Sequence, residues 1–258
     1  MSGTGVKEPD WKADAEALQQ LAPKGKIRAA LNMGNPVLVQ RDPATGKPCG
    51  VTVDMAKGLA QRLGVEVEFK EFATAGIVSD VAQDDVWDIA FLAIDPLRAE
   101  GISFTAPYVL IEGTYLVKED APLRHVDDVD QQGVTVAVGE GAAYDLFLSR
   151  TLRNASIVRV PTSEEAIARF ASIGADTAAG VRQPLETHAR ANAGFRVLDG
   201  RFTVIEQAMG SPLGREAAGR LLGQYVEFAK RSGLVADGLK RSGQSATIAP
   251  AAQPTTEV

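Results

Sequence analysis

An arginine follows directly where the chain leaves a buried strand. In the stretch 91–108, "FLAIDPLRAEGISFTAPY", an uncharged apolar run ends at Asp95 and Pro96, and Arg98 comes next. Asp95 suits a helix N-cap and Pro96 a first helical position, so we expect a helical turn whose free N–H groups face a crevice. An arginine beside such donors is suited to bind a carboxylate. From these residues alone, a surface arginine paired with Glu100 or Asp95 remains equally open.

The usual catalytic and metal-binding patterns are missing from the sequence. Cys49 is the single cysteine, and His125 and His188 stand far apart in polar surroundings. We therefore interpret Cys49 as a loop thiol and the two histidines as ordinary surface residues. The sequence contains no HExxH, GxSxG, P-loop or GxGxxG pattern. The sequence therefore predicts no metal and no cofactor, and the absence of these motifs argues against an enzyme.

The composition and net charge of the chain argue against some classes of binding partner. The chain has 258 residues, 45% of them hydrophobic and 23% charged, with a formal net charge of −6. That charge argues against a nucleic-acid partner or an anionic membrane surface. No window approaches the roughly 18 apolar residues of a membrane span. The N-terminus lacks the apolar region of a signal peptide. If Met1 is the native start the protein is cytoplasmic, and otherwise a leader has been removed.

Strands alternate with helices along most of the chain, which predicts parallel α/β sheets. Strands are expected within 26–33, 65–72, 87–94, 113–120, 133–139, 155–160, 175–181, 195–200 and 202–210, and helices within 10–22, 50–64, 140–152, 162–173 and 211–233, with a further helix around 78–82. Two such units, one interrupted by the other, predict two lobes. We place lobe I at 24–114 and 206–241 and lobe II at 115–205, with hinge crossings near 113–118 and 202–208. Residues 1–23 form an N-terminal helical extension in this prediction, and 242–258 a disordered tail.

Residues 25–240 resemble the bacterial extracellular solute-binding proteins of family 3, which feed polar amino-acid ABC transporters. The segments that carry the resemblance are "GVTVDMAKGLAQRLGVEVEF", "WDIAFLAIDPLRAEGISFTAPY", "YLVKEDAPLRHVDDVDQQGVTVAVGEGAAYDLFL" and "ADTAAGVR". The second is the most specific, because it places a small turn and an arginine before Phe-Ser/Thr-x-Pro-Tyr. The resemblance implies a two-lobed periplasmic-binding-protein fold that closes around its ligand by a hinge motion.

The resemblance also implies a binding site. The arginine at the place of Arg98 clamps the ligand's α-carboxylate in this family, and the N–H at the place of Ala93 assists. The turn "GEGAAY" reaches over from the second lobe and offers further N–H groups. The predicted ligand-binding residues are Asn35, Ala93, Asp95, Arg98, Glu140, Gly141, Ala142, Ala143, Tyr144 and Arg182.

This chain departs from the family pattern at both ends of the expected ligand. Where the family holds the carboxylate with a hydroxyl residue this chain has Asp95, and where the family holds the ammonium with an aspartate it has Val181. An ammonium facing valine would be desolvated without a partner. Asp95, Glu112 or Glu140 could supply the missing acid. Alternatively the ligand has no ammonium, and Arg182 then meets a second anionic group.

The leading functional hypothesis is non-catalytic capture of a small carboxylate-bearing solute, an amino acid or related organic acid, for an ABC permease. We expect a monomer in the periplasm by resemblance. A second hypothesis is a prephenate or arogenate dehydratase, in which Glu112, Glu140 or Asp95 acts as an acid whose pKa is raised by burial. A third is a cytoplasmic ligand sensor of the same fold.

Overall fold

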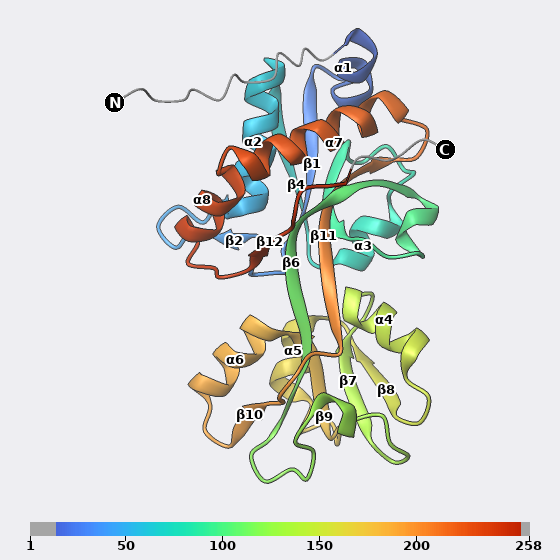
Figure 1. The fold of residues 1–258 in the computed structure, drawn as a ribbon, viewed down its shortest axis with the longest axis vertical. Coiled ribbons are helices and arrows are strands. Elements are labelled where there is room, and N and C mark those ends of the chain that lie inside the picture. The colour runs from blue at the N-terminus through green and yellow to red at the C-terminus, as the bar shows by residue number, and fades with distance from the viewer. Residues whose placement is uncertain (1–13, 254–258) are drawn as a thin grey trace.

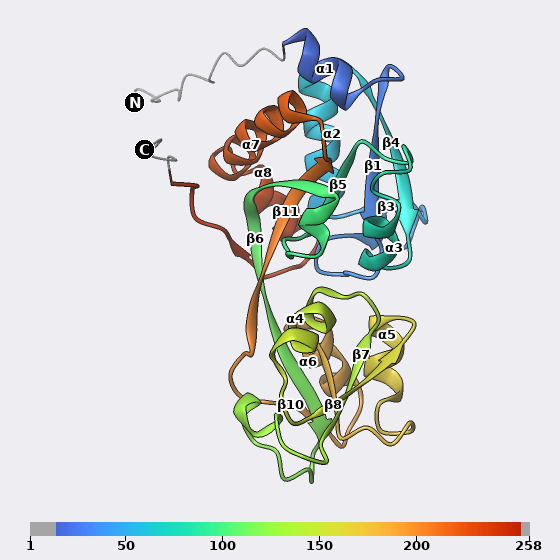
Figure 2. The same cartoon turned by 90° about the vertical axis from the view of Figure 1, so that its right-hand side faces the viewer.

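A computed structural model describes residues 14–253. The described chain forms two lobes, one above the other, joined by two long strands that pass from one lobe to the other (Figures 1 and 2). These strands are β6 (Ile102–Lys118) and β11 (Thr203–Pro212), which pair antiparallel over much of their length. The predicted crossings near 113–118 and 202–208 fall on these strands.

Lobe I is built on a sheet with the strand order β4-β1-β5-β11-β6. The strands β1 (Lys26–Asn32), β4 (Glu66–Phe72) and β5 (Ile89–Ala93) are parallel, and β11 pairs antiparallel with β5. Its helices are α1 (Ala15–Leu21), α2 (Val51–Leu63), α3 (Ala75–Asp80), α7 (Glu216–Arg231) and α8 (Leu234–Arg241), and β2 (Gln40–Arg41) with β3 (Pro48–Cys49) forms a small hairpin. Because the parallel strands end at one edge, their following loops collect there, facing lobe II.

Lobe II continues the same sheet through the second half of β6. There β6 pairs with β9 (Thr177–Val181), followed by β7 (Thr135–Gly139) and β8 (Ser156–Val160), while β10 (Phe195–Val197) pairs on the other side. The helices of this lobe are α4 (Ala143–Thr151), α5 (Ser163–Arg169) and α6 (Arg182–Ala191), and one turn of 3₁₀ helix, η2, covers Val126–Asp128. The helices α4, α5 and α6 each follow a strand, so their N-terminal ends come close to lobe I.

Local sequence signals account for several element boundaries. The helix α2 ends at Gly64, which adopts φ 66° in the left-handed region that favours glycine. The hydroxyl of Thr162 accepts a hydrogen bond from the Glu165 N–H at 3.1 Å and so starts α5. That bond is one half of a capping box. Trp87 is fully buried in lobe I, where its indole donates to the Val78 carbonyl at 3.1 Å.

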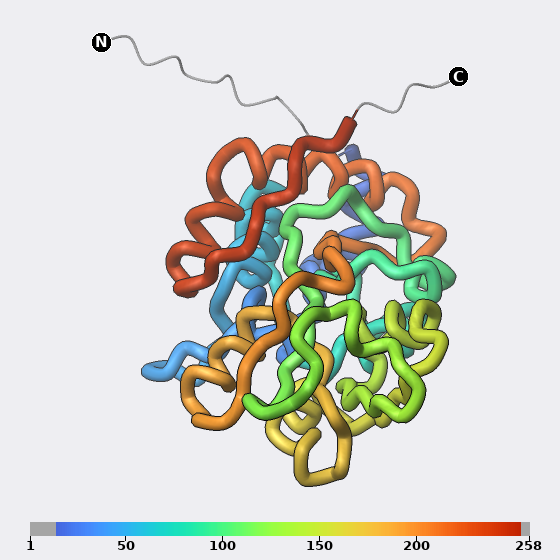
Figure 3. Tube along the Cα trace, turned by 60° about the horizontal axis from the view of Figure 1, so that its bottom comes forward, coloured from blue at the N-terminus to red at the C-terminus, as the bar shows by residue number. Residues whose placement is uncertain are grey.

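Both ends of the chain differ from the prediction. The N-terminal helix begins later than expected, with Asp14 as its N-cap, and Trp11 lies outside the described residues. The predicted disordered tail is wrong for its middle part, because β12 (Thr247–Ile248) pairs with β6 and the Ala249 N–H donates to the Tyr108 carbonyl. Figures 1 and 3 show this last segment running back along β6. The apolar residues Ile248 and Ala249 and the open edge of β6 order this segment, although its composition is typical of a disordered tail.

Lobe I also contains a buried ion cluster centred on Asp88, whose carboxylate is 0% exposed. One oxygen accepts from the backbone N–H and the Nε of Arg28, both at 2.9 Å. The other accepts from Arg28 Nη2 at 2.8 Å and Arg215 Nη1 at 2.9 Å. The cluster ties the start of β1 to the segments before β5 and α7. A buried carboxylate that satisfies two arginines makes the lobe depend on its charge.

Candidate functional site

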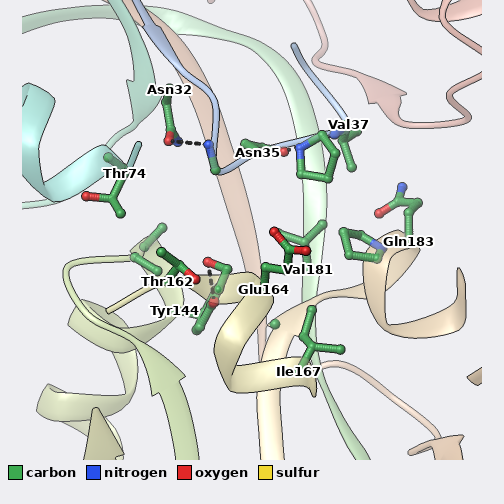
Figure 4. Close-up of a pocket in the computed structure, with 18 of the residues that line it drawn as sticks. Asn32, Asn35, Val37, Thr74, Tyr144, Thr162, Glu164, Ile167, Val181 and Gln183 are labelled. Atoms are coloured by element: carbon green, nitrogen blue, oxygen red, sulfur yellow. Dashed lines mark hydrogen bonds between the residues drawn. The ribbon is translucent and has the colours of Figure 1, made fainter. Parts of the chain in front are cut away.

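A cavity of about 840 Å3 lies between the lobes at the edge where the strands end. Lobe I contributes the loops after β1 and β4 and the end of β5, and lobe II contributes the starts of α4, α5 and α6. Figure 4 shows Asn35, Val37 and Thr74 on one side of this cleft and Tyr144, Thr162 and Glu164 on the other. Its size is in the usual range for small-molecule sites.

Arg98 lies where the two lobes meet and lines the cleft. Its Nη1 donates to the Ala93 carbonyl at 3.1 Å, in lobe I, and its Nη2 donates to the Gly141 carbonyl at 2.9 Å, in lobe II. The residue is only 2% exposed. The predicted turn is present as well, because the Ala99 N–H donates to the Asp95 carbonyl and the 3₁₀ helix η1 spans Arg98–Glu100. The sequence predicted an arginine after this strand and turn, and the structure places its side chain at the lobe boundary.

The guanidinium of Arg98 is buried, and no carboxylate in the described part of the chain forms an ion pair with it. Its Nε has no hydrogen-bond partner among the described residues. Burial lowers the pKa of Arg98 to about 10, and nearby Asp95 offsets this in part. An anion entering the cleft would therefore relieve the cost of burying this charge.

Asp95 is not brought into the cleft, contrary to the prediction. It lies in a smaller neighbouring pocket of about 120 Å3 and is 4% exposed. Its carboxylate accepts from the Leu97 N–H at 2.9 Å and from Arg150 Nη2 at 2.6 Å. Arg150 belongs to α4, so this ion pair links lobe II to lobe I beside the cleft. Asp95 therefore joins the lobes and does not face a ligand ammonium.

Replacing Arg150 with alanine should weaken ligand binding about fivefold. The change removes an ion pair that forms between the lobes, and because the Arg150 side chain is 45% exposed, we expect a loss of only about 1 kcal/mol. Titration calorimetry with any ligand found for the protein measures this effect, and added salt should diminish the difference from the parent protein. Arg153→Ala, at an exposed position of the same lobe, is the matched control. Equal affinities for all three proteins would show that the pair does not favour closure.

Arg182 is likewise turned away from the cleft. Its Nε donates to Glu112 Oε2 at 2.7 Å and its Nη2 to the Gly200 carbonyl at 2.5 Å. Glu112 also accepts from Arg201 Nη1 at 2.6 Å, and the hydrogen bonds from Arg201 and Arg182 lower the pKa of Glu112. Neither side chain lines the cleft. Glu112 is therefore held ionised at the hinge, which is the opposite of what a catalytic acid needs.

The turn "GEGAAY" reaches the cleft with most of its residues. Glu140, Ala142, Ala143 and Tyr144 line it, but the predicted Gly141 amide is already bonded to Asp145 Oδ2 at 3.0 Å. Gly141 instead makes a contact between the lobes, since a Cβ added there would lie 3.0 Å from the Gly76 Cα. Ala143 opens α4, so its N–H is one of the free donors of that helix.

Asn35 and Ala93, two further predicted residues, also line the cleft. Asn35 is buried, and its Oδ1 accepts from the Val37 N–H at 3.3 Å. Ala93 forms part of the wall at the end of β5. The Tyr144 hydroxyl donates to Ser163 Oγ at 2.7 Å, and burial raises the pKa of Tyr144 to about 12. Tyr144 is thus a neutral wall residue.

Sequence reasoning missed several cleft residues. Gln207 lies in β11, Gln183 in the first turn of α6, and Glu164 in the first turn of α5. The only signal for Gln207 was a polar residue inside the strand 202–210, and Gln183 stands next to the arginine that drew attention instead. Among residues 14–253, no group of three His, Cys, Asp or Glu side chains could hold a metal ion. Nor is any helix in this range long and apolar enough to cross a membrane.

Comparison with solved structures identifies the fold. An amino-acid ABC transporter substrate-binding protein of Streptococcus pneumoniae, bound to L-arginine, superposes with a TM-score of 0.74 and 18% sequence identity, over 90% of this chain and 99% of that one. The fold is therefore the α/β periplasmic-binding-protein fold expected from the sequence.

Two of the proteins that are similar in sequence bear on the function. The glutamine-binding protein of Geobacillus stearothermophilus is 24% identical over 211 residues, 80% of each chain. The cyclohexadienyl dehydratase of Pseudomonas aeruginosa is 32% identical over 120 residues, 45% of this chain and 44% of that enzyme. The profile of the bacterial extracellular solute-binding proteins, family 3, matches residues 27–246. Since this match covers both lobes and the cleft between them, the chain belongs to the bacterial extracellular solute-binding proteins of family 3.

Proposed function

We propose that this protein captures a small carboxylate-bearing solute, an amino acid or related organic acid, in the interlobe cleft and delivers it to an ABC permease. The observation that carries the proposal is Arg98. It is a buried cation at the lobe boundary, it lines the cleft, and no carboxylate of the described chain contacts it. A ligand carboxylate would provide the missing counter-charge and the acceptor for a charge-assisted hydrogen bond.

The contacts between the lobes support a capture mechanism based on closure. Arg98 bonds to carbonyls of both lobes, Asp95 pairs with Arg150 across the same boundary, and Gly76 packs against Gly141. Each of these contacts is lost if the lobes separate about β6 and β11. Ligand binding and closure would therefore stabilise each other. Family membership favours a place of action outside the cytoplasm.

A ligand screen tests the proposal directly. We expect the melting temperature to rise with the logarithm of ligand concentration for at least one amino acid or small organic acid, because the ligand binds only the folded state. Differential scanning fluorimetry with the twenty amino acids and a set of mono- and dicarboxylates measures this, and calorimetry confirms the affinity. The absence of any shift at millimolar concentration across the panel would remove carboxylate capture as the function.

The similarity to cyclohexadienyl dehydratase makes catalysis the second candidate. Of the three acids that could protonate a leaving hydroxyl, Glu112 and Asp95 are bonded to arginines and only Glu140 lines the cleft. Prephenate therefore belongs in the same panel. Turnover that is lost in Glu140→Gln would favour the enzyme, and binding without turnover would favour capture.

A further inference from the structure

Neutral side-chain amides lie unpaired in the cleft. Gln207 is 4% exposed and lines the cavity, and its side-chain amide makes no hydrogen bond among the described residues. On β11 it stands opposite Ala93, whose carbonyl accepts from Arg98. Residues directly opposite on antiparallel strands place their side chains on the same face. The Gln207 amide is therefore close to the end of the cleft that holds the arginine, where the register of β11 on β6 also shifts.

A second amide comes from lobe II. Gln183 Oε1 is buried and has no partner among residues 14–253. Figure 4 shows Gln183 at the cleft, on the first turn of α6, across from Asn35 and Val37. Asn35 uses its oxygen for the Val37 N–H, and its Nδ2 has no partner in the described chain. Buried polar groups are almost always hydrogen-bonded, which makes the Gln183 oxygen an exception, and the amides of Gln207 and Asn35 have further donors or acceptors free at the same cavity. Together they suit a polar guest.

The carboxylates that line the cleft are exposed to solvent, unlike the amide of Gln207, which lies on a buried residue. Among the described residues that line it, the acids are Glu140 and Glu164, and both are exposed. Apart from Arg98 and the amides, the buried residues of the lining are mostly apolar, among them Val37, Ala93 and Ile205, and the half-buried Val181 adds to them. An ammonium on the carbon next to a carboxylate that binds Arg98 would have to sit near that cation. A pair with an exposed acid is weakened by the surrounding water and does not offset burial of a second positive charge.

Building on the proposed function, we infer that the ligand is a carboxylic acid whose neighbouring polar group is neutral, such as a 2-oxo or 2-hydroxy acid, rather than an α-amino acid. The ligand carboxylate pairs with Arg98, and the oxygen of its 2-oxo or 2-hydroxy group forms hydrogen bonds with the side-chain amides of Gln207 and Gln183. A side-chain amide both donates and accepts, so it suits a carbonyl or a hydroxyl equally well. It cannot neutralise an ammonium.

Matched ligand sets test the inference. Each set has one side chain in three forms, for example leucine, 4-methyl-2-oxopentanoate and 2-hydroxy-4-methylpentanoate, and further sets are built on phenylalanine and glutamate. We expect the oxo or hydroxy form to bind at least tenfold more tightly than the amino form in calorimetry at neutral pH. Tighter binding of the amino forms overturns this inference and leaves carboxylate capture standing. No binding by any member, together with a negative carboxylate panel, overturns the proposed function itself.

Two variants separate a specific role from a structural one. Gln207→Leu should reduce the ratio of oxo- to amino-acid affinity towards one, whereas Gln61→Leu, the same change at an exposed position of α2, should not alter it. If Gln207→Leu fails to fold, Gln183→Leu serves as the second test. An equal loss for all three ligand forms in both variants would contradict the assigned role. A selective loss of the amino acid in Glu164→Gln would identify an ammonium partner and overturn the inference.

Discussion

Replacing Arg98 with methionine should weaken binding of the protein's carboxylate ligand by about 2–5 kcal/mol, or roughly 30-fold to several thousandfold. Methionine preserves an unbranched apolar stem but removes the charge and the bonds to the Ala93 and Gly141 carbonyls. The effect is large because the guanidinium is 2% exposed, so its interaction with an anion is little screened by water. Calorimetry on the ligand found in the screen measures the loss.

A ligand analogue separates loss of the carboxylate contact from loss of closure. The parent protein should discriminate strongly between the acid and its neutral amide, and Arg98→Met should bind the two with similar affinity. Arg169→Ala changes an exposed arginine of α5, whose ion-pair partner within residues 14–253 is Glu165, and should retain full affinity. If Arg98→Met still prefers the acid as strongly as the parent does, the carboxylate binds elsewhere.

Replacing Asp88 with asparagine should lower the free energy of unfolding by about 3–5 kcal/mol, because breaking a buried ion pair leaves uncompensated charge. The substitution preserves the shape of the side chain but removes the charge that faces Arg28 and Arg215, and it turns an NH2 group towards their donors. Both arginines hold elements of lobe I, so the midpoint of urea unfolding, followed by circular dichroism, reports the effect.

The matched control lies in the same cluster. Asp85→Asn also removes one negative charge next to Arg28, but the Asp85 side chain is 57% exposed, and its φ of 52° is one that asparagine tolerates. We expect a much smaller shift of the unfolding midpoint there, because water screens an exposed ion pair. Similar midpoints for the two variants would mean that burial of Asp88 contributes little.

Much of the fold could be predicted because its signals are local. The alternation of 65–72, the apolar run before Asp95 and the glycine at 64 each specify an element through their own neighbours. The tail was mispredicted because composition describes what a segment can do alone. Ile248 and Ala249 are ordered by the edge of β6, more than a hundred residues away.

The sequence by itself determined that a cation follows a buried strand and a turn, because strand, turn and arginine are consecutive. Its place in a cleft was only what the family resemblance implied. Only the tertiary structure decided which polar groups share the cleft with it. Asp95 lies close in sequence to the cleft residue Ala93, and Arg182 is next to the cleft residue Gln183. Neither Asp95 nor Arg182 faces the cleft, because Asp95 pairs with Arg150 and Arg182 with Glu112. Those pairings form between residues 55 and 70 positions apart. Their geometry depends on how two lobes meet, which no local pattern encodes.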